Sequence, residues 1–206
     1  LYDTHPAIFE PIRRRGDELI GHGRTNSERP GAFDEDGERT LIAEATAAIA
    51  KHEGRAPGGW MPPLMSQSPV TLDLLQEAGY RFVLDWPCDD QPYWMRTRAG
   101  RLLCVPYPLE TNDIVPILQL HQDPLQFVAT CVRQFEEMVE QSERAPLVFA
   151  ISLHTMIFGQ PHRLRALREG LRAILAHPLF DRVWLTRPGA IAAHCEALPP
   201  GIVPGS

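Results

Sequence analysis

Residues 147–153 read LVFAISL, and His154 follows directly. A short, continuous apolar run of this kind is typical of a buried strand in a parallel sheet. Chemistry in parallel α/β folds gathers in the loops that follow the carboxyl ends of the strands. A histidine at such an exit is well placed for acid–base work. We therefore expect a buried parallel strand here and treat His154 as a candidate catalytic residue.

Helices and further strands are predicted on both sides of this stretch. A proline marks the start of four of the helices, and Gly16 and Gly79 each mark the end of one, as helix termini usually do. Their expected ranges are 6–15, 36–53, 71–78, 123–142, 161–176 and 188–196. Strands or extended segments are expected at 17–21, 55–60, 80–84 and 183–185, with a hairpin formed by 95–97 and 101–105. This alternation predicts an α/β protein with a parallel sheet or barrel.

Composition sets limits on the size of the fold and on its partners. The 206 residues suit a single domain, 1–206, which can bury a core without disulfide or metal support. The net charge of −6, without a basic stripe, argues against nucleic acid and anionic membranes as partners. The longest apolar stretch, 145–153, is half as long as a membrane helix requires. Four cysteines without a CxxC pair predict reduced thiols and a cytoplasmic location.

The loop after the strand 17–21 reads GHGRTNSERPG and contains His22 and Asn26. If the loop makes a helical turn, their four-residue spacing places both side chains on one side, about 5–6 Å apart at Cβ. Two ligands of one metal ion would have this spacing. The alternative is a histidine that only forms a hydrogen bond within its loop.

The loop after the strand 80–84 combines carboxylates with aromatic rings. Residues 84–94 read LDWPCDDQPYW and contain three aspartates and two tryptophans. Such a cluster fits a substrate pocket with perturbed carboxyl groups, and a solvated acidic loop is the alternative. The remaining loop of this kind, GRAPGGWMPP at 54–63, places Trp60 directly after an extended segment.

Taken together, four segments in this order resemble the polysaccharide deacetylase (NodB-homology) superfamily, and more closely its allantoinase-like and cyclic-imide-hydrolase-like branch. The segments are ELIGHGRTNS, the stretch with Arg55, Pro57 and Gly59-Trp60, GYRFVLDWPCDDQPYW, and LHTMIFGQPHR. The resemblance implies a distorted (β/α) barrel. The first family motif, a strand that ends in an acidic residue, has no counterpart here, so we expect N-terminal strands of the barrel to be missing from this chain.

The resemblance also implies roles for the catalytic residues. His22 matches the first histidine of the metal-binding HxxxH motif, and Asn26 stands where the second would be. The expected cofactor is therefore either none, as in members of the allantoinase type, or one zinc-like divalent ion. Arg55 aligns with an arginine that orients a catalytic carboxylate, and His154 matches the general acid that protonates the leaving nitrogen. Groups near Trp60 would stabilise the oxyanion.

The substrate-binding residues are inferred from the same loops. We expect Asp85, Asp89 and Asp90 to hold polar substrate groups, or one of them, with Asp85 the first candidate, to act as a catalytic base. Residues expected to shape the pocket are Trp60, Trp86, Gln91, Trp94 and, unless it only begins its helix, His162.

The resulting hypothesis is hydrolysis of a non-peptide carbon–nitrogen bond in a small cyclic amide, imide or ureide. The first alternative is a metal-dependent sugar or peptidoglycan N-deacetylase. The second is a catalytically degenerate family member that only binds a ligand, an alternative motivated by Asn26. The expected partners are a small-molecule or sugar amide substrate and further copies of the chain, because this branch tends to form homo-oligomers.

Overall fold

The computed structural model describes residues 1–206, which divide into two compact units. Unit 1 contains residues 1–86, 92–105 and 186–206, and unit 2 contains residues 87–91 and 106–185. That residues 1–206 form a single catalytic domain stays a prediction.

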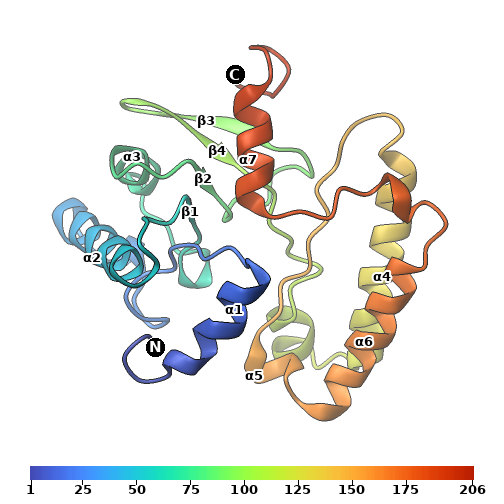
Figure 1. Cartoon of the computed structure of the whole chain (residues 1–206). Helices are drawn as coiled ribbons and strands as arrows, with labels where there is room; N and C mark the ends of the chain where they lie inside the picture. Colours follow the sequence, from blue (N-terminus) through green and yellow to red (C-terminus); the bar gives the residue numbers. More distant parts are fainter. The chain divides into compact units, whose positions relative to one another are not determined.

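Unit 1 is built around a mixed four-stranded sheet (Figure 1). Strand β1 (Gly59–Trp60) pairs in parallel with β2 (Phe82–Val83), and β2 pairs in parallel with β4 (Gly100–Cys104). Strand β3 (Tyr93–Thr97) runs antiparallel to β4 at the edge. Thr97 pairs with Gly100, so Arg98 and Ala99 form the turn of the predicted hairpin.

Four helices of unit 1 occur close to their predicted positions. They are α1 (Phe9–Arg15), α2 (Glu35–Glu53), α3 (Thr71–Glu77) and α7 (Pro188–Ala197), and short 3₁₀ turns occupy Pro6–Ile8, Pro30–Ala32 and Pro63–Met65. The Asp34 side chain caps α2 by accepting the N–H of Gly37 at 2.9 Å. Gly16 ends α1 in the left-handed conformation, at φ 71°.

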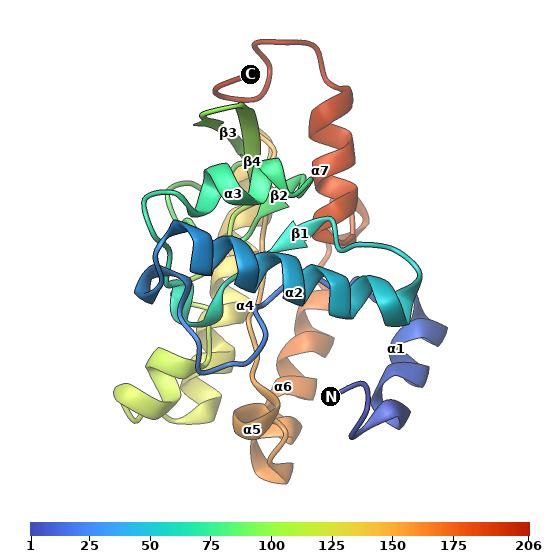
Figure 2. The ribbon, with the colours of Figure 1, turned by 90° about the vertical axis from the view of Figure 1, so that its left-hand side faces the viewer.

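Helices α2 and α3 lie side by side in front of the sheet in Figure 2. Their apolar side chains and those of the strands form the main core of unit 1. The core residues are Leu41, Ile42, Ala45, Trp60, Leu74, Leu75, Tyr80, Val83, Leu102 and Cys104. Gly59 is required in β1, because a Cβ at this position would lie 2.2 Å from the Phe82 ring.

Unit 2 is built around two long helices. They are α4 (Pro124–Gln141) and α6 (Pro161–Leu175), which the sequence predicted, and they lie side by side in Figure 1. The short helix α5 (Thr155–Phe158), a π-helix at Ile114–Gln119 and a 3₁₀ turn at Phe180–Arg182 were not predicted. Gly170 allows the long helices to approach closely, since a Cβ there would lie 2.2 Å from a methyl group of Val128.

The predicted buried strand at 147–153 is extended, but only Ser152 forms a bridge, parallel to Asn112. Two contacts interrupt a regular ladder. The N–H of Val148 donates to the carbonyl of Asp90, and the carbonyl of Ala150 accepts the Thr111 hydroxyl at 2.7 Å. Residues 147–152 are only half-buried, so the prediction of a fully buried strand was wrong.

The predicted strands at 17–21 and 183–185 are also absent. In the first segment only Gly21 pairs, with Trp60, while the Glu18 carboxylate accepts the N–H of Gly189. In the second, the N–H of Val183 donates to Phe180 and closes a 3₁₀ turn. Both segments lack the backbone pairing that defines a strand.

The α/β class is confirmed, with parallel strands and helices on the sheet. Closure into a distorted barrel stays a prediction. None of the helices combines the length and the apolar character required to span a membrane.

Candidate active site

His22 and Asn26 come together in the loop after Gly21, in unit 1. The His22 ring donates from Nδ1 to the carbonyl oxygen of Met61, and its Nε2 lies 3.1 Å from Oδ1 of Asn26. A carbonyl oxygen only accepts hydrogen bonds, so the contact with Met61 fixes the proton on Nδ1. In the neutral ring, Nε2 then carries a lone pair and faces the amide oxygen of Asn26.

An imidazole nitrogen and an amide oxygen, both groups that can bind a cation, therefore lie side by side at this point. A catalytic zinc site takes three protein ligands. No group of three histidine, cysteine, aspartate or glutamate side chains is placed to hold a metal ion in this structure. His22 and Asn26 by themselves therefore do not make a zinc site.

Asp85 lies two residues beyond β2 and is 1% exposed. Neither of its carboxyl oxygens has a hydrogen-bond partner, and burial raises the pKa of Asp85 from 3.8 to about 7. A carboxyl group with such a pKa exchanges its proton near neutral pH, a property typical of catalytic carboxyls. The indole N–H groups of Trp60 and Trp86 are also buried without a partner.

Two other predicted residues of unit 1 have different surroundings. The Trp94 ring is covered by the guanidinium group of Arg101, 4.3 Å from the ring centroid. Arg55 is exposed and precedes β1, so it lies before the strand rather than in the loop after it. It forms no ion pair, and no carboxylate is oriented by it in this structure.

In unit 2, His154 is held by Asp113, which the sequence analysis did not single out. Asp113 is fully buried, and its Oδ1 lies 2.6 Å from Nδ1 of His154. Its Oδ2 accepts the backbone N–H of the same histidine at 2.8 Å. The two contacts fix both the position of His154 and the orientation of its ring. They leave Nε2 available on a side chain that is 33% exposed.

A hydrogen-bond network aligns the segments that carry Asp113 and His154. The hydroxyl groups of Tyr107 and Ser152 lie 2.5 Å apart, and the amide of Asn112 donates to the Tyr107 oxygen at 3.0 Å. The N–H of Ser152 donates to the carbonyl of Thr111, and the N–H of Asp113 donates to the carbonyl of Ser152. Asp113 is thus held by backbone and side-chain contacts together.

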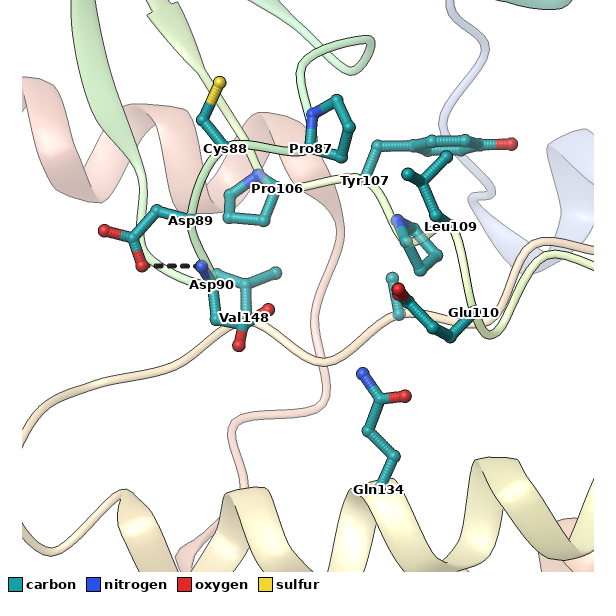
Figure 3. Close-up of a pocket in the computed structure, with 12 residues that line it drawn as sticks. Pro87, Cys88, Asp89, Asp90, Pro106, Tyr107, Leu109, Glu110, Gln134 and Val148 are labelled. Atoms are coloured by element: carbon teal, nitrogen blue, oxygen red, sulfur yellow. Dashed lines mark hydrogen bonds between the residues drawn. The ribbon is translucent and has the colours of Figure 1, made fainter.

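Asp89 and Asp90 line a cavity of about 360 Å³ in unit 2 (Figure 3). The N–H of Asp90 donates to the Asp89 carboxylate at 2.7 Å, which organises the turn. Cys88 lies beside these aspartates, Glu110 lies across the cavity next to Leu109, and α4 contributes Gln134 from below in Figure 3. The acidic loop predicted from the sequence therefore borders a cavity.

Gln91 and His162 are not among the residues that line this cavity. Gln91 is half-buried just before β3, and His162 is the exposed second residue of α6. The ring of His162 forms no hydrogen bond in the structure. Their roles in substrate binding stay predictions.

Solved structures with the same fold are found among two kinds of protein. Puue allantoinase superposes with a TM-score of 0.86 and 29% identity over 97% of this chain and 65% of its own. A protein from Pseudomonas aeruginosa PAO1 assigned as a polysaccharide deacetylase gives a TM-score of 0.85 and 28% identity, over 97% and 66% of the two chains. A protein from Mycobacterium smegmatis with the same assignment gives a TM-score of 0.78 and 25% identity, over 97% of this chain and 70% of its own.

The chain thus spans about two thirds of the length of these proteins. Comparison with protein-family models and with curated proteins finds no match. The structural likeness nevertheless covers nearly all of this chain and includes both kinds of protein that the motifs indicated. The resemblance to the allantoinase-like and polysaccharide deacetylase proteins of the NodB-homology superfamily is therefore confirmed.

Proposed function

We propose that this protein hydrolyses a non-peptide carbon–nitrogen bond in a small cyclic amide, imide or ureide. The observation that carries the proposal is the pair formed by the buried Asp113 and the partly exposed His154. The likeness to an allantoinase and to proteins assigned as polysaccharide deacetylases supports this class of reaction.

His154 acts as the general acid in this proposal. Water adds to the carbonyl carbon, and the carbon–nitrogen bond breaks as the nitrogen receives a proton from Nε2 of His154. Asp113 accepts the Nδ1 hydrogen, so it keeps Nε2 directed outward and stabilises the cationic ring that must form before the proton is delivered. An amine or amide nitrogen is a poor leaving group unless it is protonated, which gives His154 a defined task.

A base that activates water must accept a proton near neutral pH, and Asp85 of unit 1 is a carboxyl group with this property. Its pKa of about 7 would allow the carboxylate to accept a proton near neutral pH. Its exposure of 1% keeps the carboxyl group out of contact with bulk water in this structure.

A metal-dependent N-deacetylase is the second candidate. The observation that favours it is the pair of donor atoms, His22 Nε2 and Asn26 Oδ1, which lie 3.1 Å apart. A bound divalent ion would supply a Lewis acid and a more acidic water molecule.

Turnover of the purified protein after exhaustive chelation separates the candidates. We expect hydrolysis of at least one member of a panel of cyclic ureides and imides, and loss of this activity in His154→Ala. The matched control is His5→Ala, which removes an exposed histidine whose ring contacts only Thr4. Activity on acetylated hexosamines that appears only with added zinc would favour the second candidate. Absence of turnover on both panels would contradict the first proposal and support the ligand-binding alternative.

A further inference from the structure

The cavity of about 360 Å³ in unit 2 has an acidic lining without a compensating positive charge. Asp89, Asp90 and Glu110 line it, and none of its lining residues is a lysine, an arginine or a histidine. Its volume is at the lower end of the range of small-molecule sites, roughly 300–1,000 Å³. Size and charge together therefore favour a small cationic ligand.

Two of the three carboxylates are available to such a ligand. The Asp89 carboxylate accepts the backbone N–H of Asp90 at 2.7 Å and so belongs to the turn. The carboxylates of Asp90 and Glu110 form neither an ion pair nor a hydrogen bond in the structure. Figure 3 shows these two residues on opposite sides of the cavity, with Gln134 of α4 below them. A ligand in this space would meet one free carboxylate at each end.

The wall between the two carboxylates is largely apolar. Pro106, Val148 and Ala150 contribute to it, and the ring of Tyr107 lies along the upper side of the cavity in Figure 3. The Tyr107 hydroxyl lies 2.5 Å from that of Ser152, which holds the ring in place. Methylene groups are stabilised by contact with such a wall, and an ammonium group is attracted to the face of an aromatic ring.

We propose that this cavity binds an aliphatic diamine. One ammonium group pairs with Asp90 and the other with Glu110, while the methylene chain between them lies along the apolar wall. Both free carboxylates are then neutralised by one molecule. A monoamine leaves one of the carboxylates unpaired, so it should bind more weakly.

The separation of the carboxylates argues against a metal ion as the occupant. A calcium ion takes six to eight oxygen ligands arranged around one point. No three histidine, cysteine, aspartate or glutamate side chains are placed to hold a metal ion in this structure, and those that line the cavity are no exception. Two charges at the ends of a flexible chain do not require such convergence.

The cavity also lies apart from the catalytic pair proposed above. Ala150 of its wall precedes His154 by four residues in an extended segment, which corresponds to about 13 Å along the chain. Binding of a diamine is therefore independent of the proposed hydrolysis and can be measured without turnover.

Isothermal titration calorimetry of the whole protein with diaminobutane tests the proposal. We expect one molecule to bind, at least ~10-fold more tightly than butylamine, because butylamine forms only one of the two charged contacts. Butanediol, which has a similar length and no charge, should not bind, and added salt should weaken the binding of diaminobutane. Equal affinities for the diamine and the diol would overturn the proposal. So would an absence of binding for every diamine from diaminopropane to diaminohexane, or tighter binding of calcium ions than of any diamine.

Neutral variants locate the bound molecule. Asp90→Asn and Glu110→Gln should each weaken the binding of diaminobutane at least ~10-fold, and the double variant should abolish it. Because neither carboxylate has a partner in the chain, we expect all three variants to fold like the wild type, which circular dichroism checks. The matched control is Asp181→Asn, which neutralises an exposed aspartate elsewhere in unit 2 and should leave the affinity unchanged. Unchanged affinity in the folded double variant, or an equal loss in the control, would overturn the assignment to this cavity.

Discussion

Replacing Asp85 by asparagine removes a titratable group from the interior of unit 1 and keeps the size of the side chain. The carboxyl group is 1% exposed, and burial raises its pKa from 3.8 to about 7. The folded protein therefore holds this proton at pH values where the unfolded chain has already released it. As the pH rises from about 4 to about 7, the wild type loses stability, because the folded state must then bury a charge.

The size of the effect follows from the shift in pKa. Each unit corresponds to about 1.4 kcal/mol, so ionisation of Asp85 should lower the free energy of unfolding by up to about 4 kcal/mol above pH 7. Asp85→Asn has no proton to lose. The free energy of unfolding of Asp85→Asn, relative to that of the wild type, should therefore increase by up to about 4 kcal/mol as the pH rises from about 4 to about 7.

Urea denaturation of both proteins across the same pH range measures this difference, since the contributions of all other titrating groups cancel. The control is Asp181→Asn, which changes an exposed aspartate without an ion pair and should give a difference that stays constant with pH. A constant difference for Asp85→Asn as well would refute the reasoning and show that its carboxyl group is not effectively desolvated.

Three further predictions concern other parts of the molecule. Asp113→Asn should lower kcat by about 10²- to 10⁴-fold with little change in KM, because the amide cannot stabilise the cationic ring of His154. An unchanged kcat would show that Asp113 has no role in the reaction. If no metal takes part, His22→Ala and the wild type should have the same activity after chelation. Activity that returns on addition of metal to the wild type but not to His22→Ala would contradict this expectation. Gly170→Ala should lower the free energy of unfolding, measured by thermal denaturation, by about 1–3 kcal/mol, because the added methyl group meets Val128. Adding Val128→Ala should recover part of this loss. If Gly170→Ala is as stable as the wild type, α4 and α6 can separate without cost and the expectation is wrong.

Helices were predicted well because their signals are local. Asp123 and Pro124 mark the start of α4, where the aspartate side chain accepts the N–H of Leu125 at 2.7 Å. Gly16 and Gly54 end α1 and α2 at positive φ. Each of these features depends on residues a few positions apart, so the sequence is sufficient to find them.

Strands were predicted less well because they depend on distant partners. The apolar run at 147–153 is extended, yet contacts from Asp90 and Thr111 replace a regular ladder. Asp113 was missed for a similar reason, since its partner His154 is 41 residues away and no local pattern marks the pair.

The central claim is that His154 acts as a general acid, and the most direct test compares the effect of removing His154 on substrates with different leaving groups. Amide hydrolysis requires a proton on the departing nitrogen, whereas an activated aryl ester expels a stable phenolate without one. The measurement is kcat/KM of wild type and His154→Ala on a matched amide and ester with the same acyl group. We predict a loss of about 10²- to 10⁴-fold on the amide and a much smaller loss on the ester. Equal losses on both substrates, or none on the amide, would contradict the role of His154 as general acid.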